Sequence, residues 1–279
     1  MITSNQNSKI KLVRALLGRS KERREAGAFV VEGVRLVEEA VKGNWKFEFA
    51  LFDETLGERG KLQVEGLRLK GVEVEEVSAS VMKSISETET PQGILAVLEF
   101  TNPSTSSGQG LPIPQSPNFI LIPDQIRDPG NLGTLLRSAA ASGVQAVLIP
   151  PETTDAFAPK VLRSGMGAHF KLPIHSMSWE EIEKVVKPEG VALSGEAVSK
   201  GLNVYVADMD GHSYWETDLS KPIALIVGNE AEGVSESARK LANGKISIPM
   251  SDGTESLNAG VAGSVLMFEV MRQRAVNSE

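Results

Sequence analysis

The sequence predicts an α/β protein built from two domains, and three observations support that prediction. The chain has 279 residues, a length that favours two domains over one. Short apolar runs alternate with helical patterns along both halves, as they do in α/β folds. Residues 101–118 contain four prolines, four serines and no charged residue, which is the composition of a flexible linker. We therefore predict a smaller domain over residues 1–100, a linker over 101–118 and a larger domain over 119–279.

The first hundred residues begin with a helical pattern, because Ile10, Val13, Leu16 and Leu17 recur on one helix face. Short apolar runs after it predict strands, and a further helical spacing predicts a second helix. In chain order, the expected elements are a strand at 28–31, a helix around 34–41 and strands at 47–52, 72–77 and 93–100. Together they predict a small α/β sandwich.

The larger domain contains near-continuous apolar runs at 119–122, 146–149, 191–193 and 223–227. Strands that are buried on both faces have this pattern, so we predict a parallel sheet covered by helices. One helix is expected to begin near Asn131, after an Asp-Pro-Gly turn. The last helix is expected over residues 256–274.

The composition excludes several classes of protein. The chain has no cysteine, which excludes disulfide scaffolds, thiol nucleophiles and iron–sulfur clusters, and its three histidines are scattered. No apolar run reaches the roughly 18 to 20 residues that span a bilayer, and the first residues lead into no segment like that of a signal peptide. We expect a cytoplasmic protein with no metal and no membrane partner.

The charge is unevenly distributed. The net charge of −7 argues against a nucleic-acid partner, yet residues 1–24 carry seven basic residues and one acidic residue. This cluster is either a set of phosphate contacts or a solvated helix face, and the charge count alone does not decide between them.

The first segment whose residues could bind a ligand or take part in a reaction runs from Ile122 to Pro150. Its DPGNLG turn brings glycines and unpaired helix-start amides together, so it could hold a polar ligand. Arg137 stands out on a helix of small and apolar residues, where a fixed guanidinium could grip a phosphate with two hydrogen bonds. The alternative is that Arg137 pairs with a carboxylate such as Asp124 or Asp128.

The second segment, residues 224–236, is a buried strand that breaks at Gly228 and delivers Asn229 and Glu230 at its carboxyl end, where ligands bind in open α/β sheets. Gly228 and Gly233 have the spacing of a phosphate loop. The lysine that such a loop requires is absent, which argues strongly against a nucleoside-triphosphatase. A plain strand-to-helix turn with exposed acids is the alternative.

The third segment, residues 245–270, passes from a strand end through a turn into a helix that opens with Ser256, Leu257 and Asn258. Small residues fill the first turns of this helix, so a ligand or another backbone can approach it closely. The alternative is a tightly crossed helix, because glycines inside a helix otherwise cost stability. The small residues are Ala259, Gly260, Ala262 and Gly263.

Three blocks of this chain, DPGNLGTLLRSAAASG, IVGNEAEGVS and IPMSDGTESLNAGVA, resemble in order and spacing the three motifs of the SpoU (TrmH) family of S-adenosylmethionine-dependent RNA ribose 2′-O-methyltransferases. The resemblance implies a C-terminal SPOUT-type α/β domain with a deep trefoil knot. It also implies a homodimer whose active sites form where two such domains meet, and a reaction without metal. By layout, the first hundred residues resemble the substrate-binding extension of this family, which has a fold like that of ribosomal protein L30e.

The resemblance also implies site residues. The family's functional polar residues fall on Asn131, Arg137, Glu230, Ser256 and Asn258. The cofactor is expected against Gly228, Asn229, Ile248, Met250, Leu257 and Asn258. Arg14, Arg19, Lys21, Arg23 and Arg24 are the expected RNA phosphate contacts.

The sequence leaves two possible roles for Arg137. The guanidinium either acts as the base for the 2′-hydroxyl or grips the adjacent phosphate while a phosphate oxygen or water takes the proton. The extension favours ribosomal RNA, 23S rRNA in particular, as the substrate. A catalytically silent RNA-binding or ribosome-assembly protein on the same scaffold is the alternative function, and a small-molecule enzyme with an unrelated α/β fold is the third.

Overall fold

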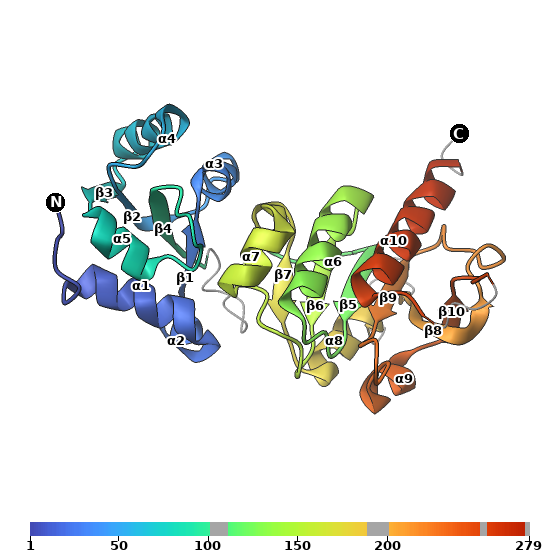
Figure 1. Ribbon diagram of the computed structural model, residues 1–279. Helices are drawn as coiled ribbons and strands as arrows, with labels where there is room; N and C mark the ends of the chain where they lie inside the picture. Colours follow the sequence, from blue (N-terminus) through green and yellow to red (C-terminus); the bar gives the residue numbers. More distant parts are fainter. Residues whose placement is uncertain (101–110, 189–200, 252–255, 277–279) are drawn as a thin grey trace, which may run out of the picture. The chain divides into compact units, whose positions relative to one another are not determined.

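The computed structural model describes residues 1–100, 111–188, 201–251 and 256–276 (Figure 1). The chain divides into two compact units, one formed by Met1–Gly110 with Phe157–Lys171, the other by Leu111–Ala156 with Leu172–Glu279. Residues 101–110 of the expected linker and the strand expected at 191–193 lie outside the described residues.

The first unit contains a four-stranded sheet. In spatial order β1 pairs antiparallel with β4, β4 antiparallel with β2, and β2 parallel with β3. The four strands predicted in this half are therefore present, with boundaries that differ by at most one residue. Their bounds are Ala28–Glu32 for β1, Phe47–Phe52 for β2, Glu73–Glu76 for β3 and Ile94–Glu99 for β4.

Helices cover the sheet of the first unit. Helices α1 and α5 share a core with one face of the sheet, in which Ile10, Val13 and Leu16 are buried as predicted, whereas Leu17 is only partly buried. Helix α3 contacts β1 and β4, and α4 contacts β3. The sequence did not predict α2, α4 or α5. The bounds are Ser8–Gly18 for α1, Ser20–Ala26 for α2, Val34–Lys42 for α3, Glu58–Leu69 for α4 and Ala79–Ile85 for α5.

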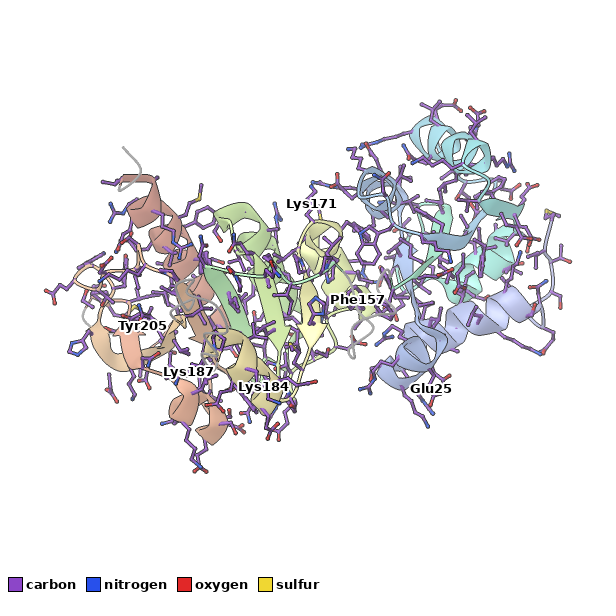
Figure 2. All side chains as sticks on the ribbon, turned by 180° about the vertical axis from the view of Figure 1, so that it is seen from behind. Glu25, Phe157, Lys171, Lys184, Lys187 and Tyr205 are labelled. Atoms are coloured by element: carbon purple, nitrogen blue, oxygen red, sulfur yellow. The ribbon has the colours of Figure 1, made fainter. Side chains whose placement is uncertain are left out.

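Residues 157–171 correct the predicted domain boundary, because they belong to the first unit although we expected them in the second. They form α7 (Pro159–Gly165) and a 3-10 turn, η1 (Ala168–Phe170). The ring centroid of Phe157 lies 4.9 Å from those of both Phe29 and Phe100. Figure 2 labels Phe157 and Lys171, the two ends of this segment.

The second unit contains a six-stranded sheet in which every pair of neighbours is parallel, as the apolar runs predicted. The spatial order is β10-β8-β9-β5-β6-β7. Strands β7, β8 and β10 were not among the predicted apolar runs. The bounds are Phe119–Pro123 for β5, Ala146–Ile149 for β6, Ile174–Ser176 for β7, Asn203–Ser213 for β8, Ile223–Val227 for β9 and Gly244–Ser247 for β10.

Helices lie on both faces of this sheet. Helices α8 (Trp179–Val186) and α9 (Glu236–Leu241) share a core with Ile122, Ala224 and Ile226 on one face. Helices α6 (Pro129–Ser142) and α10 (Ala259–Val276) lie side by side on the other face (Figure 1). The last helix begins at Ala259 and not at Ser256 as predicted, because Asn258 caps it by accepting a hydrogen bond from the backbone N–H of Val261.

The described helices of both units are too short or too polar to cross a membrane. Across the ranges that the structure describes, no helix combines the length and the apolar composition that crossing a bilayer requires. The trefoil knot stays a prediction of the family resemblance.

Candidate functional site

The three sequence motifs meet at one carboxylate. Glu230, just beyond the carboxyl end of β9, accepts a hydrogen bond from Asn131 Nδ2 through its Oε1 atom. The same oxygen accepts from Asn258 Nδ2 at 3.3 Å and from the backbone N–H of Ala259 at 3.1 Å. Asn258 Nδ2 also lies 2.8 Å from Asn131 Oδ1. The side chains of three segments that are distant in sequence therefore form one closed network.

The local sequence explains why each side chain reaches the network. Asp128 caps α6 by accepting from the backbone N–H of Asn131 at 2.8 Å, which places Asn131 in the first turn of that helix. Asn258 caps α10 with its Oδ1 atom, so its Nδ2 atom is left to donate to its neighbours. Glu230 sits at the amino-terminal end of α10, where the helix dipole favours a negative charge.

The loop that carries Glu230 is closed by its glycines. Asn229 and Gly233 exchange two backbone hydrogen bonds, of 2.8 Å and 2.9 Å. A Cβ atom at Gly228 would lie 2.5 Å from the carbonyl oxygen of Gly233, so only glycine fits there. The glycine spacing that resembles a phosphate loop thus serves a tight turn, and Glu230 lies within that turn.

A buried aspartate ties this loop to the neighbouring strand. Asp124 follows β5, is fully buried, and accepts from the backbone N–H of Ser235 at 2.6 Å. Its Oδ1 atom has no hydrogen-bond partner. Burial raises the pKa of the Asp124 carboxyl, against the opposing effect of the Ser235 hydrogen bonds.

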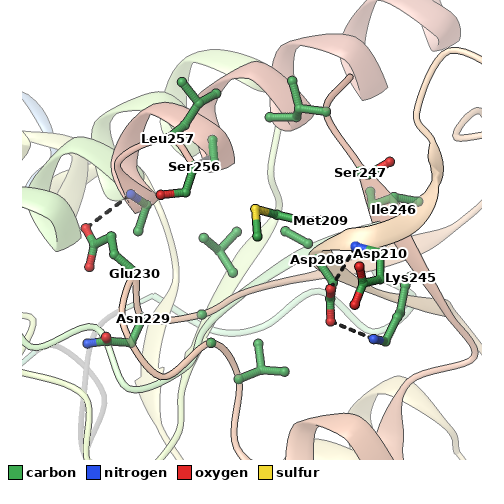
Figure 3. Close-up of a pocket in the computed structure, with 18 of the residues that line it drawn as sticks. Asp208, Met209, Asp210, Asn229, Glu230, Lys245, Ile246, Ser247, Ser256 and Leu257 are labelled. Atoms are coloured by element: carbon green, nitrogen blue, oxygen red, sulfur yellow. Dashed lines mark hydrogen bonds and ion pairs between the residues drawn. The ribbon is translucent and has the colours of Figure 1, made fainter. Parts of the chain in front are cut away.

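A pocket of about 390 Å³ opens beside Glu230 (Figure 3). Ser256 and Glu230 line it, and so do five of the six residues expected to hold the cofactor. Asn258 is the exception, because it faces Asn131 and Glu230 at the edge. The five are Gly228, Asn229, Ile248, Met250 and Leu257.

The remainder of the pocket wall was not predicted. Val227, Ile246 and Leu266 give it apolar surface, and Asp208, Asp210, Arg239 and Lys245 give it charges. Lys245 Nζ lies 2.8 Å from Asp208 Oδ2, and that hydrogen bond is the main cause that lowers the pKa of Asp208. Apolar residues alternate with polar ones at the start of β8, which was the available signal for this strand.

The small residues of α10 have two separate uses. A Cβ atom at Gly263 would lie 2.3 Å from a methyl carbon of Leu135, and one at Gly260 would lie 3.2 Å from Thr134. These glycines therefore permit close packing of α10 against α6. This agrees with the alternative that the small residues serve a tightly crossed helix. Ala259 and Ala262 line the pocket instead.

Arg137 lies outside this network within one chain, so its predicted place in the site depends on a second copy of the chain, as the expected homodimer implies. It lies on the exposed side of α6, about 9 Å along the helix axis from Asn131. Its guanidinium makes no hydrogen bond or ion pair with any other described residue. The alternative of a pair with Asp124 or Asp128 is therefore wrong, since these accept from Ser235 and Asn131.

The basic cluster of the first unit is only partly available to a ligand. Arg23 is 4% exposed and its Nη1 atom donates to the carbonyl oxygen of Leu16, so it cannot be a phosphate contact as predicted. Lys21 pairs with Glu25, and the exposed Arg14 donates to Asn5 and Ser84. Arg19 and Arg24 are exposed. Four of the five predicted contacts thus lie at the surface.

The histidine and carboxylate side chains were compared as possible metal ligands over the described ranges. Within the part that the structure describes, no group of three or more histidine, aspartate or glutamate side chains could hold a metal ion.

Comparison with known proteins gives a consistent result for both units. Residues 118–268 match the SpoU rRNA Methylase family, and residues 7–96 match the MRM3-like substrate binding domain. The 23S rRNA (guanosine(2553)-2'-O)-methyltransferase RlmP of Bacillus subtilis is 33% identical over 96% of this chain and 98% of its own. The mitochondrial rRNA methyltransferase 3 of Homo sapiens is 33% identical over 90% of this chain and 69% of its own.

Solved structures of similar proteins extend over nearly the whole chain. An rRNA methyltransferase from Sinorhizobium meliloti has a TM-score of 0.80 and 27% identity, with 97% of this chain and 96% of that chain covered. The SpoU methyltransferase AviRb from Streptomyces viridochromogenes, in complex with AdoMet, has a TM-score of 0.77 and 26% identity. That match covers 97% of this chain and 100% of AviRb.

Proposed function

This chain belongs to the SpoU rRNA methylase family, and from that premise we propose how its residues transfer a methyl group from S-adenosylmethionine to a ribose 2′-hydroxyl of ribosomal RNA. The observation that carries the proposal is the convergence of Asn131, Glu230 and Asn258 at the edge of one pocket. A catalytically silent relative would have no need to keep these three side chains in one network.

The pocket fits S-adenosylmethionine in its chemistry. Its apolar wall, which includes Val227, Ile246 and Leu257, can take the flat face of an adenine, while charged groups on another wall can take a polar end. When bound, S-adenosylmethionine supplies a methyl group activated by the positive charge on its sulfur. The methyl acceptor must then approach from the side of Glu230, where the polar network lies.

The polar network positions the ribose. Transfer of a methyl group to a hydroxyl requires the attacking oxygen to lie in line with the bond that breaks, and alignment of this kind can contribute about 7 to 11 kcal/mol. Asn131 and Asn258 hold the Glu230 carboxylate in one orientation, so an incoming hydroxyl meets a fixed acceptor. Ser256, on the pocket wall, is the second polar group available to the sugar.

Arg137 completes the site from a second copy of the chain. Helix α10 presents Val261, Phe268 and Met271 to solvent, each 46% to 47% exposed, on a helix whose other face is buried. We propose that this face packs against its counterpart in a homodimer, which covers the apolar surface. Arg137 lies on the adjacent α6, so the dimer would bring Arg137 of the partner subunit to the pocket. There it either takes the hydroxyl proton or holds the neighbouring phosphate through its planar fork.

The first unit selects the RNA in this proposal. The 2′-hydroxyl distinguishes RNA from DNA but carries no sequence information, so the target must be recognised elsewhere. Arg14, Arg19, Lys21 and Arg24 are surface cations that suit phosphate contacts. The same proposal includes the domains at 1–100 and 119–279 with a linker at 101–118, except that residues 157–171 belong to the first unit. It also includes the knotted chain path and a cytoplasmic location.

A labelled-methyl assay tests the function. The full chain is incubated with S-adenosylmethionine that carries a labelled methyl group and with 23S rRNA, or with a DNA of the same sequence. We expect label in the RNA alone, resistant to alkali at one nucleotide because 2′-O-methylation blocks cleavage there. Label in neither nucleic acid would contradict the proposal.

A further inference from the structure

Two loops of the second unit hold a pair of polar side chains. Gln125 lies just beyond the end of β5, and Glu152 lies just beyond the end of β6. Gln125 Nε2 donates to Glu152 Oε2 at 3.0 Å. The two strands are parallel neighbours, so the pair lies at the carboxyl edge of the sheet, where ligands bind in open α/β folds.

Both residues have an uncommon backbone conformation. The φ angle is +55° at Gln125 and +68° at Glu152, in the left-handed region that glycine adopts most readily. The two loops are also tied to each other, because Thr153 Oγ1 donates to the carbonyl oxygen of Pro123 at 2.8 Å. Side chains held on such backbone are found at ligand sites more often than elsewhere.

The pair lies beside the network that positions the ribose in the proposed function. Strand β5 is also the parallel neighbour of β9, which Glu230 follows. Asn229, next to Glu230 on the same loop in Figure 3, donates through Nδ2 to the carbonyl oxygen of Gln125 at 3.2 Å. Glu230, Gln125 and Glu152 thus follow three successive strands, and adjacent strands lie about 4.8 Å apart.

The donor pocket lies on the other side of this network. Its lining residues belong to β8, β9, β10, the loops after them and the helices α9 and α10, and none of them belongs to the loops after β5 and β6. A ribose at Glu230 that turns its 2′-hydroxyl toward the donor can place its base over those two loops. Glu152 lies about two strand spacings from Glu230, a distance that a nucleoside can bridge.

The pair offers a hydrogen-bonding edge that matches one base. Glu152 uses one hydrogen of Gln125 Nε2, so the second can donate, and the carboxylate has lone pairs for two further donors. The edge therefore presents a donor, an acceptor and an acceptor. The Watson–Crick edge of guanine presents the complement, with an acceptor at O6 and donors at N1 and N2. Adenine, cytosine and uracil would each turn an acceptor toward the carboxylate.

We propose that Gln125 and Glu152 read the base of the methylated nucleotide and select guanine. Glu152 accepts from N1 and N2 of the base, and Gln125 donates to O6. The inference rests on the proposed function and adds to it the identity of the nucleotide. Because base pairing occupies the same atoms of guanine, the target guanosine is unpaired when it binds.

The nucleoside that carries the transferred methyl group is the first test. The full chain transfers a labelled methyl group to 23S rRNA, and the RNA is then digested to nucleosides and separated by chromatography. We expect the label in 2′-O-methylguanosine. Label in a different nucleoside would overturn the inference while the proposed function stands, and no label in the RNA would overturn both.

A change in the base tests the contact with Glu152. Inosine lacks the N2 amino group, so 23S rRNA with inosine at the methylated position loses one donor to the carboxylate. We expect the native chain to be about tenfold slower in single turnover on the inosine RNA, as loss of a hydrogen bond to a charged group predicts. Glu152→Ala should be about tenfold slower on the guanosine RNA and should react with both RNAs at rates within about twofold.

The controls separate base reading from folding. Glu152 does not line the donor pocket, so Glu152→Ala should bind S-adenosylmethionine with native affinity in calorimetry. Glu236→Ala removes an exposed carboxylate that pairs with Lys240, and it should keep the native preference for guanosine. Gln125→Gly fits the left-handed conformation, so its expected loss of rate on the guanosine RNA cannot come from backbone strain.

Two results would overturn the inference while methyl transfer itself persists. Equal rates of the native chain on the guanosine and inosine RNAs would do so, and this comparison needs no variant. A preference for guanosine that Glu152→Ala keeps would also do so, because another group would then read N2.

Discussion

Asn258 Nδ2 lies 2.8 Å from Asn131 Oδ1, and this contact joins the start of α10 to the start of α6. The same Nδ2 atom lies 3.3 Å from Glu230 Oε1, so one amide group holds all three sequence motifs together. Its other end, Oδ1, caps α10. The orientation of this side chain is thereby fixed before any substrate binds, which is what in-line transfer requires.

Removing the carboxylate at the centre of the network should abolish most of the activity. Glu230→Ala leaves Asn131 Nδ2 and the backbone N–H of Ala259 without their acceptor. We expect single-turnover methyl transfer to fall roughly a hundredfold or more. Glu236→Ala is the matched control, because this carboxylate follows the same loop, pairs with Lys240 and does not line the pocket. Equal rates for the two variants would show that Glu230 has no special role.

Arg137→Lys should lose activity although it keeps the positive charge. A lysine cannot reproduce the two parallel hydrogen bonds of a guanidinium, so we expect a decrease on the order of a hundredfold in single-turnover rate. S-adenosylmethionine affinity should stay nearly unchanged, because both roles considered for Arg137 act on the RNA, at the ribose hydroxyl or its neighbouring phosphate. A near-normal rate would exclude both roles considered for this residue.

Mixing two inactive variants tests whether Arg137 acts across the dimer. An Arg137→Lys chain and a Glu230→Ala chain each lack one part of the site. In a mixed dimer one of the two sites would have both native residues, so random assembly should restore about a quarter of the native activity. Mixtures that stay inactive would place Arg137 and Glu230 in the same chain's site.

The exposed face of α10 should control the oligomeric state. Phe268→Glu puts a charge in the centre of an apolar surface, which the dimer would have to bury. We expect the variant to sediment as a monomer and to lose methyl transfer while it remains folded. Leu69→Glu, a change at a 90% exposed leucine of α4, is the control and should leave the dimer intact. A dimeric Phe268→Glu would rule out this interface.

The basic residues of the first unit should affect RNA binding unequally. Replacing Arg14, Arg19, Lys21 and Arg24 with glutamine should flatten the salt dependence of RNA affinity, by roughly 0.7 to 0.9 in slope for each phosphate that is no longer bound. Arg23→Gln should instead lower the melting temperature, because Arg23 is buried and donates to the carbonyl oxygen of Leu16. An unchanged salt slope in the fourfold variant would make the cluster an ordinary solvated helix face.

Asp124 should make stability depend on pH. Burial raises its pKa in the folded state, so the folded chain binds the proton more tightly than the unfolded chain does. The carboxyl therefore favours folding at low pH, and that contribution is lost as the pH rises from the unfolded pKa through the folded pKa. Asp124→Asn cannot ionise, so the stability of the native chain relative to this variant should fall across that window. Thermal unfolding of both proteins as a function of pH measures the difference, and parallel curves would contradict the expectation.

The sequence predicted those elements whose apolar pattern is continuous. Strands such as β5 and β9 are buried on both faces and stand out, whereas β8 carries Asp208, Asp210 and Gly211 in its second half and loses the strand pattern there. The charged wall of the pocket lies in that half, so no apolar pattern indicated it. The position of residues 157–171 was also not predictable, because it depends on the packing of Phe157 against Phe29 and Phe100.

In the candidate site, too, the sequence placed some residues correctly and others not. Asn131, Glu230 and Asn258 lie at helix starts and a strand end, where the order of elements in a parallel sheet brings side chains together. Whether Arg23 and Arg137 are exposed depends on the helix face on which each side chain lies. A count of charges does not contain that information. Arg23 points into the core and Arg137 points to solvent.

Mapping of ribose methylation across total RNA, in cells with and without the gene, tests the central claim most directly. We predict that one ribosomal RNA nucleotide loses its 2′-O-methyl group when the gene is absent. The native gene should restore that methyl group, and a gene encoding Glu230→Ala should not. An identical methylation map in all of these cells would contradict the assignment of this pocket to ribose methylation.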